Sequence, residues 1–297
     1  MTSTTPDTTT QSTPDDATTT IRLLVSCPDR PGIVAAVSRF LFESGANIIR
    51  SDQYSTDPSG GSFFLRTEFA LPVTAHEGLA ERFGLLADRF SMTWRLWEAR
   101  RRKRVAILVS GYDHCLVDLL YRWQRDELNG DIVLVASNHE DFRDIVETAE
   151  VPFHHVPVQK GHKPEAEAKL LEVLDGKCDV VVLARYMQIL SGEFLDRAGV
   201  PVINIHHSFL PAFAGAGPYE RARERGVKLI GATAHYVTVE LDAGPIIEQD
   251  VVRVSHADDV PSLVRQGAEV ERAVLSRAVQ WHCQDRVLRH ANTTVVF

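Results

Sequence analysis

The sequence lacks three features that would have placed the protein in other classes. None of its 297 residues belongs to a run of about eighteen apolar residues, so we expect no membrane-spanning helix and no membrane partner. Lysine and arginine number 32 against 40 aspartate and glutamate residues, a net charge of −8 that argues against a nucleic-acid partner. No Cys-x-x-Cys pair occurs among Cys27, Cys115, Cys178 and Cys283, which predicts free thiols in a cytoplasmic protein instead of a disulfide framework or a zinc site.

The composition is ordinary for a globular protein, with 44% hydrophobic and 24% charged residues, and the length suggests about two domains. The first twenty residues differ from the rest, because ten are threonine and none is lysine or arginine. A secretory signal needs a basic start and an apolar stretch, and a transit peptide is rich in arginine. We therefore expect residues 1–20 to form a disordered tail.

Regular patterns begin at residue 21 and predict a small domain over residues 21–98. Extended runs alternate with two segments of helical apolar spacing, and Asp57-Pro58-Ser59-Gly60-Gly61 separates two of the runs as a hairpin turn would. The predicted strands are 21–26, 47–56, 62–70 and 92–98, and the predicted helices begin near residues 33 and 75. The resulting order, βαββαβ, is that of a ferredoxin-like domain.

A basic segment, Arg100-Arg101-Arg102-Lys103-Arg104, follows this domain. Such a run can form a nuclear-import or nucleic-acid patch. With an acidic chain, a solvated linker over residues 99–104 is the better interpretation.

The remaining residues, 105–297, alternate short apolar strands with helices, which predicts an α/β domain with an open, mostly parallel sheet covered by helices on both faces. The expected strands are 105–110, 132–137, 154–158, 180–183 and 202–206, with sheet additions at 229–237 and 246–254. The expected helices are 114–128, 140–148, 163–174, 218–225 and 258–281.

Ligands of open α/β sheets bind beyond the carboxyl ends of the strands, and the most polar of these ends is that of residues 202–206. Alternation places Asn204 and His206 on one face of this strand and His207 on the other. Asparagine can donate to a developing oxyanion, and histidine changes protonation near neutral pH. The same residues could equally cap a buried turn. Asp242, in Leu241-Asp242-Ala243-Gly244-Pro245, would by itself indicate only a turn.

In combination, the motifs are far more specific. Asn204-x-His206 followed by Ser208-Phe209-Leu210-Pro211, with Asp242 in an Asp-x-Gly-Pro turn, resembles the folate-dependent formyltransferase fold. Gly231-Ala232-Thr233-Ala234-His235-Tyr236-Val237 narrows the resemblance to the water-using branch, the formyltetrahydrofolate deformylases. The first domain, with Asp29-Arg30-Pro31-Gly32-Ile33-Val34, resembles an ACT domain, which precedes the catalytic domain in that family.

This resemblance implies hydrolysis of 10-formyltetrahydrofolate to tetrahydrofolate and formate, supplying purine biosynthesis. Asn204 and His206 would stabilise the formyl oxygen, and Asp242 would position and activate the water or hold His206 in its useful protonation state. The folate is the substrate, so no cofactor and no metal are implied. The pairs His154-His155 and His206-His207 do not alter this expectation, because adjacent strand residues face opposite sides.

The folate itself is expected to lie against six further residues, Arg185, Tyr186, Met187, Val239, Leu241 and Gly215. Tyr186 and Met187 could instead be core residues. One departure from the family is Gly217, where a lysine or arginine usually stands, and it affects the expected affinity for an anionic substrate more than the reaction type.

Two other functions stay open at this point. Formyl transfer to an amine such as glycinamide ribonucleotide needs a phosphate-binding loop, which Ser110-Gly111-Tyr112-Asp113-His114 resembles poorly. A non-catalytic folate or amino-acid sensor would not need all three of the proposed catalytic residues. The ACT resemblance implies a homo-oligomer and a methionine or glycine effector near Asp29 and Gly32, or else a purely structural module for dimerisation.

Overall fold

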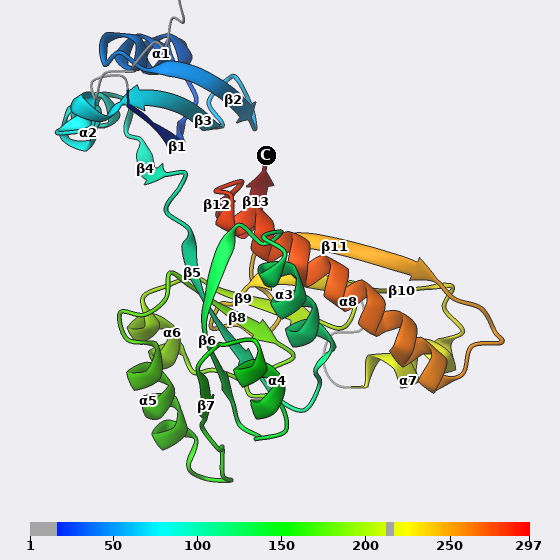
Figure 1. Cartoon of the computed structure of the whole chain (residues 1–297). Helices are drawn as coiled ribbons and strands as arrows, with labels where there is room; N and C mark the ends of the chain where they lie inside the picture. Colours follow the sequence, from blue (N-terminus) through cyan, green and yellow to red (C-terminus); the bar gives the residue numbers. More distant parts are fainter. Residues whose placement is uncertain (1–16, 212–216) are drawn as a thin grey trace, which may run out of the picture. The chain divides into compact units, whose positions relative to one another are not determined.

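The computed structural model describes residues 17–211 and 217–297, which fall into two compact units divided between Arg101 and Arg102. The first unit has the predicted order βαββαβ (Figure 1). Its elements are β1 (Thr18–Pro28), α1 (Ile33–Glu43), β2 (Asn47–Ser55), β3 (Ser62–Pro72), α2 (Leu79–Phe90) and β4 (Thr93–Glu98), with a 3₁₀ turn at Val73–Ala75. The strands form an antiparallel sheet in the order β2-β3-β1-β4.

One face of this sheet packs against both helices. Alternate residues of β1, from Ile21 to Cys27, share a core with Val37 of α1 and Phe83 of α2. Because side chains alternate along a strand, this single core explains the period-two pattern that predicts β1. The ACT-like arrangement expected from the sequence is confirmed.

The first strand begins earlier than the sequence predicts. Thr18, Thr19 and Thr20 pair with Pro72, Leu71 and Ala70 of β3, so the prediction of a disordered tail is wrong for these three residues. Threonine is β-branched and favours extended backbone, and β3 is long enough to offer it partners. The predicted tail residues 1–16 lie outside the described part of the chain.

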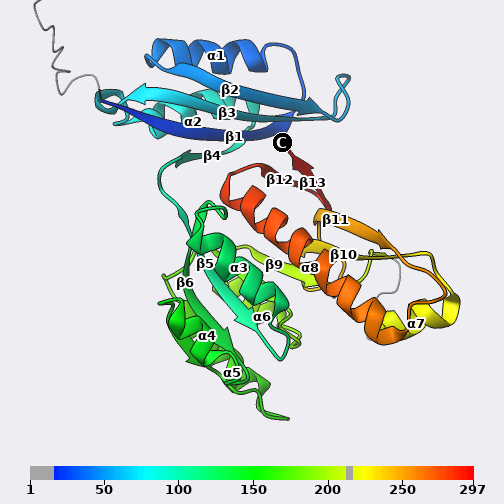
Figure 2. The same ribbon diagram turned by 45° about the vertical axis from the view of Figure 1, so that its right-hand side comes forward.

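The second unit contains a seven-stranded sheet in the order β11-β10-β9-β8-β5-β6-β7 (Figures 1 and 2). Five strands are parallel, namely β5 (Lys103–Val109), β6 (Gly130–Ser137), β7 (Phe153–His155), β8 (Val180–Ala184) and β9 (Val202–His206). The other two, β10 (Leu229–Tyr236) and β11 (Ile246–Arg253), are antiparallel additions at one edge. The predicted open, mostly parallel sheet is therefore confirmed.

Helices cover both faces of this sheet, and each face has its own apolar core. They are α3 (His114–Gln124), α4 (Arg143–Thr148), α5 (Lys163–Leu174), α6 (Gly192–Ala198), α7 (Pro218–Arg225) and α8 (Val260–Cys283). Local periodicity predicts neither α6 nor the C-terminal hairpin of β12 (Val287–His290) and β13 (Thr293–Val296), because both are too short to show a period. None of the described helices is long and apolar enough to cross a membrane.

The basic segment is not a solvated linker throughout. Lys103 and Arg104 are the first residues of β5, and Lys103 is 2% exposed. Its ammonium group pairs with the buried carboxylate of Asp285, while Arg104 pairs with Asp179 at 3.0 Å. The prediction fails here because the carboxylates that neutralise these cations are distant in sequence.

Candidate active site

The carboxyl ends of β8 and β9, which are neighbours in the parallel sheet, border a cavity of about 260 Å³. This position agrees with the general placement of ligands in open α/β sheets. The cavity is lined by residues 185–190 after β8, by residues 204–207 at the end of β9 and by the loop 237–242 after β10. Three segments that are distant in sequence thus meet at one edge of the sheet.

The structure brings Asn204, His206 and Asp242 together at this cavity. The Nδ1 atom of His206 lies 3.3 Å from Oδ1 of Asp242. Asp242 occupies the left-handed backbone region, with φ of 55°, and this conformation belongs to the turn that follows β10. The strand therefore positions the histidine, and the turn carries the carboxylate toward it.

A fourth polar residue, His235, completes the group, although no sequence pattern assigns it a role. It pairs across the β10–β9 ladder with Asn204, and its Nε2 lies 3.3 Å from Nδ2 of that residue. Its Nδ1 lies 3.0 Å from the carbonyl oxygen of Tyr236, so Nδ1 carries the proton and Nε2 accepts from the asparagine amide. The antiparallel register between β10 and β9 was the signal that could have identified it.

The surroundings of Asp242 and His235 determine whether each side chain is charged at neutral pH. The hydrogen bond from His206 is the main cause that lowers the pKa of Asp242, so the carboxylate is ionised at neutral pH. Burial lowers the pKa of His235, which is therefore neutral. The Nε2 atom of His206 is buried and has no hydrogen-bond partner within the described residues. A buried polar atom without a partner is uncommon and points to a role in binding or catalysis.

His207 does not simply face away from Asn204 and His206, as strand alternation predicts, because it lines the cavity too. Its ring centroid is 5.2 Å from that of His206 and 6.1 Å from that of Tyr219, and it borders the cavity as well as an apolar pocket on its other side. Because β9 ends at His206, the alternation rule no longer governs the next residue. Burial, followed by the charge of Arg185, lowers the pKa of His207 to about 4.

The predicted folate-binding residues lie around the same cavity, except for one outside the described residues. Arg185, Tyr186, Met187, Val239 and Leu241 all line it. Tyr186 is 6% exposed and also belongs to the core, whereas Met187, Val239 and Leu241 are more than half exposed. Exposed apolar side chains around a cavity suit a flat aromatic ligand. Gly215 lies outside the described residues.

Gly217, where the family usually has a cation, immediately precedes α7 with φ of 64°. This left-handed conformation favours glycine over any residue with a side chain. The backbone at this position therefore suits the glycine of this chain better than the lysine or arginine that is usual in the family.

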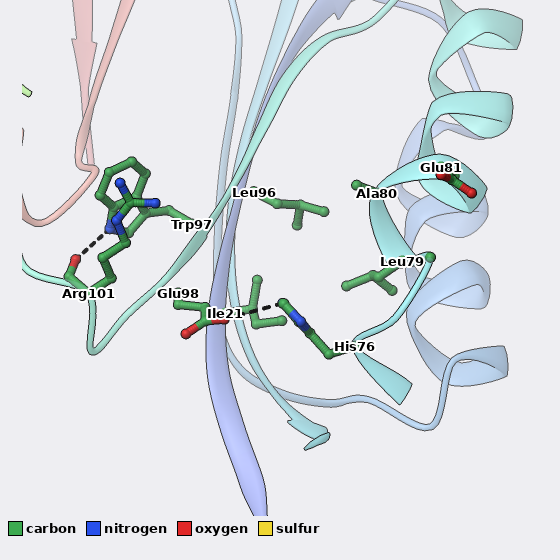
Figure 3. A pocket seen from close by; sticks show the side chains of 10 residues that line it. Ile21, His76, Leu79, Ala80, Glu81, Leu96, Trp97, Glu98 and Arg101 are labelled. Carbon is green, nitrogen blue, oxygen red and sulfur yellow. Dashed lines mark hydrogen bonds and ion pairs between the residues drawn. The ribbon is translucent and has the colours of Figure 1, made fainter. Parts of the chain in front are cut away.

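The predicted effector residues lie at the turn between β1 and α1. Gly32 precedes α1 with φ of 96° and borders a groove of about 470 Å³ between the two helices, while Asp29 accepts a hydrogen bond from the hydroxyl of Ser55. A separate cavity of about 440 Å³ lies at the other end of this unit (Figure 3). There, His76 pairs with Glu98 at 3.5 Å and Trp97 Nε1 donates to the carbonyl oxygen of Arg101.

Within the described residues, three side chains of the metal-ligand type come together only once. His114, Cys115 and Glu271 have ligand atoms within 4.8 Å of one another. The carboxylate of Glu271 already accepts hydrogen bonds from His114 and Tyr219 and lies 3.4 Å from the guanidinium of Arg185. A group that is so occupied, beside a fixed cation, is poorly suited to a metal ion. The two adjacent histidine pairs do not belong to it.

The chain is also similar in sequence to known protein families. The formyl transferase family model matches residues 103–279, and the ACT domain model matches residues 21–87. The chain is 60% identical to the formyltetrahydrofolate deformylase of Mycobacterium tuberculosis over 93% of this chain and 90% of that protein. It is 56% identical to the Bacillus subtilis deformylase, with 93% of each chain covered.

Solved structures give the same result. A formyltetrahydrofolate deformylase from Pseudomonas syringae matches with a TM-score of 0.91 and 50% identity, and 95% of each chain is covered. A glycinamide ribonucleotide transformylase from Symbiobacterium toebii matches with a TM-score of 0.63 and 29% identity over 68% of this chain and 98% of that one.

Proposed function

The chain belongs to the formyltetrahydrofolate deformylase family and hydrolyses 10-formyltetrahydrofolate to tetrahydrofolate and formate, and we propose that Asn204, His206 and Asp242 carry out this reaction. The folate is the substrate, and the reaction needs no cofactor. The observation that supports the assignment of residues is the convergence of these three side chains on one cavity.

The attacking water is activated by Asp242. Its carboxylate, ionised because His206 donates to it, accepts a hydrogen bond from the water and takes a proton as the oxygen attacks the formyl carbon. A carbon–oxygen bond forms, and the carbonyl oxygen becomes an oxyanion. Collapse of this adduct breaks the carbon–nitrogen bond, and the proton held by Asp242 passes to the departing N10. Formic acid then ionises to formate and a proton.

The developing oxyanion is stabilised by Asn204 and His206. The asparagine amide has two N–H groups, and because one donates to Nε2 of His235, the other is held in a fixed direction. His235 is thus a positioning residue for Asn204. A donor of this kind contributes about 10²–10³-fold to the rate.

The apolar residues at the mouth of the cavity support a site for the pterin ring. Met187, Val239 and Leu241 present exposed apolar surface there, and Tyr186 closes the inner wall. Tyr186 thus serves both the core and the ligand.

The structure disfavours formyl transfer to a phosphorylated amine. Tyr112, in the loop where a transferase would bind the phosphate, lies 4.7 Å beneath the guanidinium of Arg185, and His114 donates to the carboxylate of Glu271. With the bulky Tyr112 held there, this loop is poorly suited to bind a phosphate. The sensor alternative is disfavoured by the presence of the complete acid–base group.

The cellular setting of the reaction is also part of the proposal. Four buried thiols without a disulfide are typical of a reducing cytoplasm. The ACT domain supports an amino-acid effector, for which methionine and glycine near Asp29 and Gly32 are the candidates, and it supports assembly into a homo-oligomer. The formate would supply purine biosynthesis.

The test is to mix the purified protein with 10-formyltetrahydrofolate, with and without glycinamide ribonucleotide, and to measure formate and tetrahydrofolate. Equal amounts of both products in the absence of the amine are expected. Turnover that depends on the amine would identify a transferase, and folate binding without any turnover would identify a sensor.

A further inference from the structure

Arg185 stands apart from the other residues of the reaction cavity. Among the described residues that line it, Arg185 is the only one with a permanent positive charge. It directly follows β8, is 7% exposed and has φ of 62°. Such a backbone conformation is unfavourable for a large side chain and is found preferentially where a ligand is held.

The guanidinium is held from two sides. Its Nε lies 3.4 Å from Oε2 of Glu271, and its Cζ lies over the ring of Tyr112, 4.7 Å from the ring centroid. Glu271 is 2% exposed and accepts hydrogen bonds from His114 at 2.9 Å and from Tyr219 at 2.7 Å. Burial alone would raise the pKa of Glu271, but the bond from His114 and the charge of Arg185 lower it, so this carboxylate is ionised.

The helix that carries Glu271 is adapted to this arrangement. Gly267 lies one turn earlier on α8, and a Cβ atom at that position would overlap the hydroxyl of Tyr219. Glycine is unfavourable inside a helix, so its presence here indicates a packing requirement. Only a residue without a side chain lets Tyr219 reach the carboxylate. The sequence of α8 is therefore adapted to place Glu271, bonded to Tyr219, where it holds Arg185.

The charge of Arg185 acts at the reacting end of the cavity. After burial, it is the largest cause that depresses the pKa of His207, whose ring lies next to that of His206. The carboxylates of the folate, in contrast, belong to its glutamate end and are separated from the formyl carbon by the aminobenzoyl ring. A cation at the formyl end is better placed for the other anion in the reaction, which is formate.

We infer that Arg185 binds the formate released by hydrolysis, held in place by Glu271 and Tyr112, an inference that rests on the proposed function. A planar guanidinium matches a carboxylate with two parallel hydrogen bonds. Within the described residues the guanidinium makes no hydrogen bond, and Glu271 is its only ion-pair partner, so N–H groups remain for the product. Hydrolysis creates a carboxylate, whereas transfer to an amine creates a neutral formamide that would not need this cation.

The inference is tested by titrating the folate-free protein with sodium formate and following the formate proton by saturation-transfer NMR. Arg185→Gln is expected to weaken formate binding by about 10- to 100-fold, the range for loss of hydrogen bonds to a charged group. Arg277→Gln is the matched control, because Arg277 also pairs with carboxylates, Glu248 and Asp250, but does not line the cavity. It is expected to bind formate like the wild type.

Two further variants keep the test decisive if Arg185→Gln does not fold. Arg185→Lys keeps the charge but not the planar fork, and Glu271→Gln removes the anchor, so both are expected to bind formate more weakly than the wild type. Unchanged formate binding in the folded Arg185 variants would overturn the inference, as would a raised KM for 10-formyltetrahydrofolate without any change in formate affinity. A wild-type protein that binds formate through Arg185 but releases none from the folate would contradict only the proposed function.

Discussion

Nδ1 of His206 lies 3.3 Å from Oδ1 of Asp242, although the histidine ends β9 and the aspartate belongs to the loop after β10. The relationship matters because each group sets the state of the other. The carboxylate stays ionised beside the imidazole and accepts a hydrogen bond from its Nδ1. In the proposed reaction this pair acts as the base toward the water, and Nε2 of the ring has no hydrogen-bond partner within the described residues.

Asp242→Asn is expected to lower kcat for formate release by about 10²–10⁴-fold, because the amide cannot take the proton of the water. Asparagine tolerates left-handed backbone, so the turn should keep its shape and folate binding should change little. His206→Ala should have the same effect on kcat. Formate release and the dissociation constant for folate are the measurements.

The matched control for this prediction is Asp250→Asn, which removes a carboxylate from β11 that pairs with Arg277 away from the cavity. Its kcat should equal that of the wild type. Wild-type turnover in Asp242→Asn would exclude Asp242 as the base.

The pKa of His207 gives a prediction for the pH dependence of stability. The group takes its proton near pH 6.5 in the unfolded chain but only near pH 4 in the fold. Between these values the unfolded chain binds more protons, so the free energy of unfolding should fall as the pH drops from 6.5 toward 4, by about 2–3 kcal/mol in total. Asp242 contributes only at the low end of this window, because its pKa is lowered from 3.8.

Urea unfolding at neutral pH and near pH 5 measures this loss. His207→Gln should reduce the pH dependence but not abolish it, since the pKa values of His154 and His235 are lowered too. His256→Gln, a change at an exposed histidine, is the control variant. An unchanged slope in His207→Gln would show that His207 titrates normally in the fold.

Gly267→Ala should destabilise the protein even though alanine is the better helix former. The added Cβ overlaps Tyr219, and we expect the free energy of unfolding to fall by about 1–3 kcal/mol. In a Tyr219→Ala background the clash is absent, and the same change should be neutral or stabilising. Denaturant unfolding of the four proteins measures this coupling.

Gly84, inside α2, provides the control for this series. A Cβ at this position would make only an ordinary contact of 3.8 Å with Trp94. Gly84→Ala should therefore stabilise the first unit by about 0.5–1 kcal/mol. If Gly267→Ala is also stabilising, Tyr219 does not depend on the missing side chain.

Lys103→Met should lower the free energy of unfolding by about 3–5 kcal/mol, because it leaves the buried carboxylate of Asp285 without its cation. The double variant with Asp285→Asn should recover part of this loss. Chemical denaturation checks both values. A loss below about 1 kcal/mol would mean that the pair behaves like one exposed to solvent.

These examples show what the sequence could and could not predict. The alternation of strands and helices, and helices such as Lys163–Leu174, depend on local periodicity and are visible in the sequence. Asn204, His206 and Asp242 follow from motif resemblance, which already carries the spatial information. His235 is found only from the register of two antiparallel strands.

Buried charges are the other class of residue that the sequence conceals. Glu271 lies on an amphipathic helix between Val270 and Arg272, where a carboxylate usually indicates the solvent face. Its burial depends on partners from the start of α3, the end of β8 and α7, which meet only in the fold. The burial of Lys103, which the sequence predicts to lie in a solvated linker, is concealed for the same reason.

Arg185 and Asp242 share left-handed backbone, a conformation that costs about 1–2 kcal/mol for a residue with a side chain. Glycine would relieve this cost at both positions, yet neither is glycine. Under the roles proposed for these two residues, selection for heat resistance and selection for turnover oppose each other there. If the protein were evolved in the laboratory for heat resistance alone, substitutions at Arg185 and Asp242 would be expected to appear early. Formate release would be lost with them.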